Sequence, residues 1–131
     1  MRKGIRKLSL ALFLTLVSTM GMAQSVGWRS SVEYLEENVY RIVFDAEIPG
    51  EYHMYDMGPY GEGGPMATSI VVTPGPGVEL IGRVEVLTTP YYFTNSFGRI
   101  GAFEGMARFA QKIKLTVHKA SVGAYLAWMI C

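Results

Sequence analysis

Three side chains in this sequence could carry nucleophilic or metal-binding chemistry: the only cysteine, Cys131, and the two histidines, His53 and His118. A thiolate is both a nucleophile and a metal ligand, but a zinc site needs three or four ligands at suitable spacing. Two distant histidines and one cysteine do not make that pattern, so we expect no metal site and no bound cofactor. Cys131 is the candidate for thiol chemistry, and the alternative is a small apolar core residue.

Two other segments have compositions that functional loops can share. Residues 58–65 are glycine-rich, but they lack lysine and precede a strand pattern, whereas a phosphate-binding loop opens a helix. We therefore predict an ordinary loop. Residues 91–103 concentrate aromatic side chains, which either fold back onto the core or cover a reactive group. The G-x-S-x-G motif of many serine hydrolases is absent, so a hydrolase is unsupported.

The first residues have the three-part pattern of a secretion signal. A basic start is followed by an apolar stretch over residues 8–17, which is shorter than the roughly 20 residues of a membrane-spanning helix. Gly21 and Ala23 supply the small side chains that signal peptidase reads, so we expect a signal peptide over residues 1–23 and one domain over residues 24–131. An uncleaved anchor is the alternative.

The charge of the expected domain excludes some partners. The signal holds four of the 12 basic residues and none of the 11 acidic ones, so the rest of the chain has a formal charge of −3. No cluster of arginines or lysines remains. This argues against nucleic acid and anionic lipid as partners.

Strand patterns dominate the expected domain. Apolar and polar side chains alternate over residues 40–48 and 109–117, which is typical of strands with one buried face. We expect seven strands and no helix, over residues 28–34, 40–48, 51–57, 70–73, 78–86, 109–117 and 122–131. Residues 58–65 and 88–102 are expected to be irregular. Seven short strands predict an all-β fold, an immunoglobulin-like β-sandwich, with a small barrel as the alternative.

Several motifs occur in the order of a known domain. The sequence reads FEGMARF at 103–109, QKIKLTV at 111–117 and ASVGA at 120–124, and a strand ending in Cys131 follows. Upstream, residues 50–55 read GEYHMY. Over most of residues 26–131 the chain resembles the N-terminal periplasmic domain of the thiol:disulfide interchange protein DsbD family, a group of protein-disulfide reductases.

That resemblance implies a fold, a site and partners. The family domain is an immunoglobulin-like sandwich that carries two cysteines on a hairpin. It passes reducing equivalents from a membrane electron-transfer domain to thioredoxin-like periplasmic proteins. By this resemblance Cys131 is the first exchange cysteine, Phe103 is the cap-loop phenylalanine over it, and Tyr55 and His53 line the site. The expected location is the periplasm.

The chain also departs from the family pattern. His53 stands where tyrosine is usual, and Gly101 and Ala102 replace acidic residues before the cap phenylalanine. No second cysteine is present. Because a mixed disulfide must be resolved by a second thiol, we expect a C-terminally incomplete domain that is inactive as a reductase by itself. Whether the chain is an enzyme stays open.

The alternative function belongs to a different class. A secreted immunoglobulin-like binding or structural module could carry Cys131 as an incidental buried residue. A Cys131→Ser variant separates the two hypotheses, because only the redox module depends on the sulfur.

Overall fold

A computed structural model of the chain describes residues 12–18 and 26–131. The predicted signal peptide, residues 1–23, lies mostly outside the described residues, and cleavage after Ala23 stays a prediction. Within it, Leu12–Ser18 forms strand β1. The described ranges contain no helix long and apolar enough to cross a membrane.

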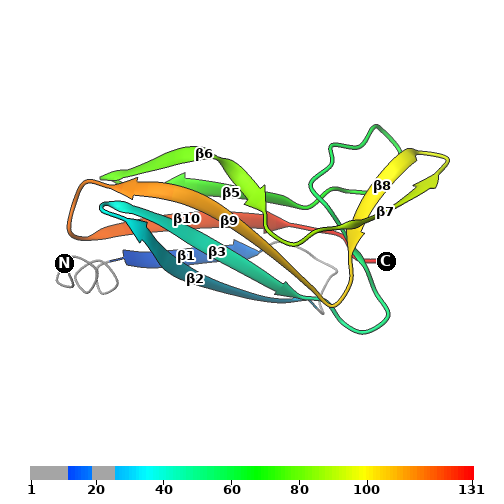
Figure 1. Ribbon diagram of the computed structural model, residues 1–131, viewed down its shortest axis with the longest axis horizontal. Coiled ribbons are helices and arrows are strands. Elements are labelled where there is room, and N and C mark those ends of the chain that lie inside the picture. The colour runs from blue at the N-terminus through cyan, green and yellow to red at the C-terminus, as the bar shows by residue number, and fades with distance from the viewer. Residues whose placement is uncertain (1–11, 19–25) are drawn as a thin grey trace.

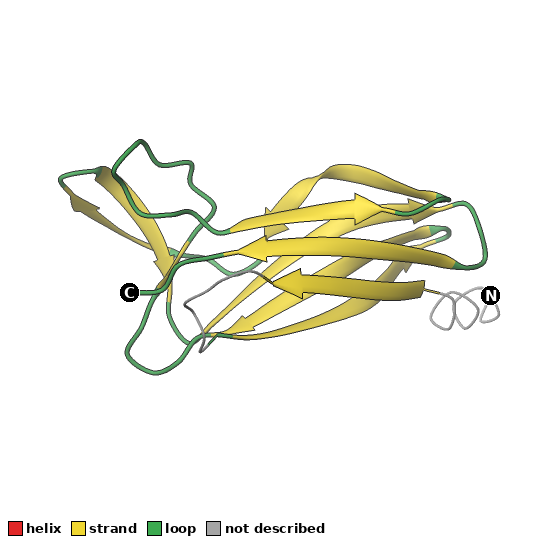
Figure 2. Cartoon of the chain, turned by 180° about the vertical axis from the view of Figure 1, so that it is seen from behind, coloured by secondary structure: helices red, strands yellow, loops and turns green. Residues whose placement is uncertain are grey.

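Every regular element of the described chain is a strand (Figure 2). The strands are β1 (Leu12–Ser18), β2 (Gly27–Glu36), β3 (Val39–Glu47), β4 (Met54–Tyr55), β5 (Ser69–Pro74), β6 (Val78–Val86), β7 (Tyr91–Asn95), β8 (Gly98–Phe103), β9 (Met106–Leu115) and β10 (Ala120–Ala127). The all-β prediction is confirmed.

Seven of the described strands, β2 to β6, β9 and β10, match the predicted ones with shifted ends. The strand predicted over residues 122–131 ends at Ala127, and the chain pairs again beyond it, where Ile130 forms an isolated bridge to Met54. The prediction that residues 88–102 are irregular is wrong, because β7 and β8 form an antiparallel hairpin there. All five side chains of β7 are exposed, so no alternation of burial marks it.

Two sheets form the body of the molecule (Figure 1). One is antiparallel with the order β2-β3-β9-β6, and the other has the order β1-β10-β5, in which β1 runs parallel to β10. Alternate side chains of β3, β9 and β10 meet between the sheets, which is the arrangement of a β-sandwich. Fully buried members of this core include Ile42, Phe44, Phe109, Ile113 and Leu126. The fold is an immunoglobulin-like sandwich, as predicted.

A third, small sheet with the order β4-β8-β7 projects from the end of the sandwich where the C-terminus lies (Figure 1). Two of its connections to the body bear on the site. The chain passes from β8 to β9 through a tight turn at Gly105, whose φ is +79° and whose carbonyl accepts a 2.8 Å hydrogen bond from the Ile48 amide. The bridge between Met54 and Ile130 connects β4 to the C-terminal segment.

Aromatic side chains close the sandwich beneath this small sheet. The ring centroids of Trp28 and Trp128 are 5.5 Å apart, and Trp28 lies 6.1 Å from Phe109. Phe103 meets Phe109 edge to face at 5.7 Å. Edge-to-face packing of large rings stabilises such a cluster beyond simple area burial. Phe103 thus packs the end of β8 against the aromatic cluster of the sandwich.

Candidate functional site

Cys131 is held beside His53 by the backbone. The His53 amide donates to the Cys131 carbonyl at 3.0 Å, and the Cys131 amide donates to the His53 carbonyl at 3.0 Å. Two reciprocal bonds define a directly opposed antiparallel pair, whose side chains project from the same face of the sheet. The pairing continues the bridge between Met54 and Ile130 by one residue. His53 and Cys131, 78 positions apart in the sequence, thus become cross-strand neighbours.

Tyr55 lies on the same face, two residues after His53. Burial raises the pKa of the Tyr55 hydroxyl, and the hydrogen bond to the Cys131 thiol and the nearby charges of Cys131 and Tyr91 raise the pKa further. A raised pKa keeps the phenol protonated, so its hydroxyl is a hydrogen-bond donor at neutral pH. The Tyr55 hydroxyl can therefore stabilise negative charge on the sulfur of Cys131.

The third side of the site comes from β7 and from the turn after β8. Tyr91 and Tyr55 are both paired with Ala102, so they flank its small side chain on one face. The Tyr91 hydroxyl lies 3.0 Å from His53 Nδ1, and a Glu104 carboxylate oxygen lies 3.6 Å from the same nitrogen. Burial first, and then the charge and hydrogen bond of Glu104, raise the pKa of Tyr91.

The cysteine itself is exposed. This corrects the expectation, attached to the binding-module hypothesis, that Cys131 is a buried residue. Cys131 lies four residues beyond the end of β10 at Ala127 and is paired with His53, so its side chain lies outside the sandwich core. An exposed thiol beside hydrogen-bond donors has the access that exchange chemistry needs.

Phe103 occupies a different environment. It is the last residue of β8, is 2% exposed and packs edge to face on Phe109 in the core. Phe103 pairs with Met54, and Met54 in turn bridges to Ile130, so strand β4 lies between Phe103 and the C-terminal segment. The structure thus gives it a core position in a strand, and its role as a cap over Cys131 stays a prediction. The aromatic side chains of the hairpin that are exposed are Tyr91, Tyr92, Phe93 and Phe97.

The opposite face of the small sheet anchors the glycine-rich loop. The Tyr60 hydroxyl donates to the Asp56 carboxylate and accepts a 2.9 Å hydrogen bond from the Gly101 amide. Burial and the Asp56 hydrogen bond raise the pKa of Tyr60 to about 12. A Cβ at position 101 would overlap the Asp56 carboxylate and come within 2.9 Å of the Tyr92 ring. Residues 58–65 are thus a structural loop, and Gly101 leaves the room that their anchor requires.

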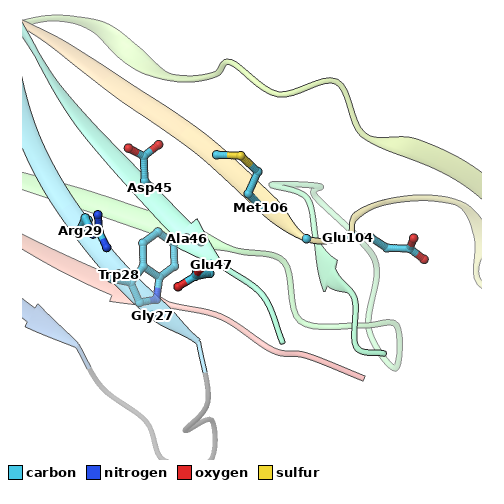
Figure 3. A pocket seen from close by; sticks show the side chains of 9 residues that line it. Gly27, Trp28, Arg29, Asp45, Ala46, Glu47, Glu104 and Met106 are labelled. Atoms are coloured by element: carbon cyan, nitrogen blue, oxygen red, sulfur yellow. The ribbon is translucent and has the colours of Figure 1, made fainter. Parts of the chain in front are cut away.

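An open groove of about 640 Å³ lies near the site, along the start of β2, the end of β3 and the turn before β9 (Figure 3). Glu104, whose carboxylate faces His53, is one of its lining residues. Asp45 in the same lining is paired with Arg108 at 2.7 Å and 3.1 Å. The described residues contain no group of three acidic, histidine or cysteine side chains placed to hold a metal ion. The expectation of no metal and no cofactor stays a prediction.

The sequence therefore identified three members of the cluster and missed two. Cys131, Tyr55 and His53 lie together, as the resemblance implies. Tyr91 and Glu104 were not singled out individually, although Tyr91 belongs to the aromatic segment and Glu104 follows Phe103 directly. Tyr91 reaches His53 across a separation of 38 positions, which no local pattern reveals.

Comparison with known proteins adds information about the fold. No protein-family model and no curated protein matches the sequence. The structure is similar to the N-terminal periplasmic domain of ScsB from Proteus mirabilis, with a TM-score of 0.57 and 14% sequence identity. The two share one fold. The likeness covers 86% of this chain and 43% of that chain, so this sequence spans less than half of the compared protein.

Proposed function

We propose that this chain is a periplasmic thiol–disulfide exchange module in which Cys131 is the exchange thiol. The observation that carries the proposal is the placement of an exposed thiol that is paired through its backbone with His53 and lies beside Tyr55. The fold supports it, because the structurally similar domain of ScsB is a periplasmic domain. The order of motifs from residue 50 to Cys131 supports it independently.

The chemistry is an attack by one sulfur on another. The Cys131 thiolate attacks one sulfur of a partner disulfide, a new S–S bond forms, and the second partner sulfur leaves as a thiolate. The electrons for reduction of the partner come from Cys131, which ends in a mixed disulfide. Thioredoxin-like periplasmic proteins are the partners we propose, and a membrane electron-transfer domain is the proposed source of reducing equivalents.

Release of the partner needs another thiol. The sequence holds one cysteine, so the resolving thiol must come from outside it, either from a further polypeptide or from a small thiol such as glutathione. We therefore expect stoichiometric capture of a partner by this chain and no turnover until a thiol is added.

The test is capture of a mixed disulfide. A thioredoxin-like protein is loaded as a disulfide with a coloured thiol leaving group, mixed with the chain and analysed by intact mass. We expect a covalent complex with a mass equal to the sum of the two proteins, formed by the native sequence and reversed by reductant. Absence of the complex at protein concentrations near 100 μM, with Cys131 confirmed as free thiol, contradicts the proposal.

A binding module is the second candidate, and the exposed hairpin aromatics favour it. Tyr92 and Phe97 are 51% and 55% exposed, and aromatic side chains of this kind are enriched in protein interfaces. A partner that binds the native chain and the Cys131→Ser variant equally, without a covalent product, would support this second function over the first.

A further inference from the structure

The exchange step described above uses the sulfur of Cys131 and does not use the imidazole of His53. His53 is the direct cross-strand neighbour of Cys131, and two 3.0 Å backbone hydrogen bonds fix that relation. Side chains opposed in this way have Cβ atoms about 5 Å apart. The imidazole is half-buried, with 34% of the side chain exposed, so it lies at the edge of the site and remains in contact with solvent.

The partners of His53 Nδ1 determine which ring nitrogen is available as a base. The Tyr91 hydroxyl lies 3.0 Å from His53 Nδ1, and its oxygen can accept a proton from that nitrogen. The Glu104 carboxylate, 3.6 Å from Nδ1, favours a proton on the same nitrogen. A neutral imidazole protonated at Nδ1 has its lone pair on Nε2.

We propose that His53 is the base that accepts the proton of the Cys131 thiol, and that Tyr91 and Glu104 orient its imidazole ring. This inference rests on the proposed function and assigns a residue to the same reaction. The S–H bond of Cys131 breaks, its proton passes to Nε2 of His53, and an imidazolium and a thiolate remain side by side. Cys131 is then the nucleophile, His53 is its base, and the Glu104 carboxylate orients the base.

The pH dependence of the reaction follows from the groups around His53. The described structure places Tyr91 from β7, Glu104 from the turn after β8 and Cys131 from the C-terminal segment against His53, and Tyr55 from β4 lies beside Cys131. The α-carboxylate of the expressed chain is the same in every variant and cancels in a comparison. Loss of the imidazole removes the group that accepts the thiol proton, so the reaction of Cys131 should become slower.

The experiment measures the rate of Cys131 alkylation by iodoacetamide from pH 5.5 to 9.5, by intact mass, in the full chain. At pH 7 we expect His53→Gln to react about tenfold more slowly than the native sequence, because the base that accepts the thiol proton is lost. Tyr91→Phe and Glu104→Gln should shift the profile in the same direction by a smaller factor, about twofold to threefold. His118→Gln is the matched control, because His118 lies exposed in the turn before β10, and its profile should be unchanged.

Folding of each variant is checked by tryptophan fluorescence, which reports on Trp28 and Trp128. If His53→Gln does not fold, Tyr91→Phe decides the question, because it removes only a hydroxyl. A folded variant whose profile superimposes on the native one overturns the inference. Failure of the exchange proposal would instead appear as absence of a mixed disulfide with the protein partner, which the alkylation assay does not involve.

Discussion

The sandwich body and β7, the outer strand of the small sheet β4-β8-β7, differ in how their side chains are buried. In the body, β3 and β9 bury nearly every inward side chain, and Ile42, Phe44, Phe109 and Ile113 are fully buried. In the small sheet, every side chain of β7 is exposed, and polar contacts connect the strands to their surroundings. The body supplies stability through apolar burial, whereas the small sheet supplies an accessible surface on which Cys131, His53 and Tyr55 meet.

The largest effect should be a complete loss of function without a loss of stability. Cys131→Ser removes the only sulfur nucleophile of the chain, so no mixed disulfide with a thioredoxin-like partner can form. Because Cys131 is exposed, the free energy of unfolding should change by less than about 0.5 kcal/mol. Intact-mass analysis and urea unfolding measure the two quantities. A large loss of stability would show that the Cys131 side chain packs in the sandwich core, and it would contradict the contrast between the two regions.

A substitution in the body should have the reverse pattern. Phe109 is fully buried and contacts both Trp28 and Phe103. Phe109→Ala should lower the free energy of unfolding by about 3–5 kcal/mol, because it removes a large apolar side chain and leaves a cavity. Urea unfolding followed by circular dichroism tests this. Phe97→Ala, at a 55% exposed position of the hairpin, is the matched control, and a similar loss there would contradict the contrast.

Gly101 tests how much space the small sheet leaves. A larger side chain there must displace the Asp56 carboxylate or the Tyr92 ring. Gly101→Val should therefore cost about 1–3 kcal/mol of stability by overpacking, and hydrogen exchange should increase in β4, β7 and β8 and not in β3 and β9. Gly50→Val is the control, since a Cβ at Gly50 meets no atom within 4 Å. Uniform exchange in both regions would mean that they unfold as one unit.

Tyr60 gives the smallest effect and a pH signature. Its pKa is raised from 10.0 to about 12 in the folded chain, so the folded state favours the protonated phenol. The resulting stability is complete below pH 10 and decreases as the pH rises toward about 12. Tyr60→Phe should cost about 1 kcal/mol at pH 7 for the lost hydrogen bonds, and it should weaken the decrease of stability above pH 10. Urea unfolding at pH 7, 10 and 11.5 measures both effects, and an unchanged alkaline slope would contradict them.

The strands of the sandwich body were predictable because their burial follows the alternation of apolar and polar residues in the sequence. Alternating burial in β3 and β9 follows the alternation of side chains in residues 40–48 and 109–117. The hairpin of β7 and β8 was missed because β7 is exposed on both faces and Gly98 and Gly101 interrupt β8. Its pairing depends on contacts with β4, which itself consists of two residues.

The site was predictable only in part for a related reason. Resemblance to a family brought Cys131, Tyr55 and His53 together, and the structure places them on one face. Tyr91 and Glu104 join them through a fold-dependent contact to one imidazole nitrogen. Phe103 was assigned by motif position, but its side chain packs into the core. A motif gives the position of a residue in the chain, whereas the alternation of side chains along the strand determines the face to which its ring points.

The central claim is that the fold makes Cys131 an exchange thiol, and a rate ratio tests it most directly. The rate of mixed-disulfide formation with a thioredoxin-like disulfide is measured for the native chain and for a ten-residue peptide of sequence VGAYLAWMIC, residues 122–131. Both carry the same thiol and the same local sequence, but only the chain presents His53, Tyr55 and Tyr91 around it. We predict a rate at least tenfold higher for the folded chain at pH 7. Equal rates would show that the sandwich contributes nothing to the thiol and would contradict the claim.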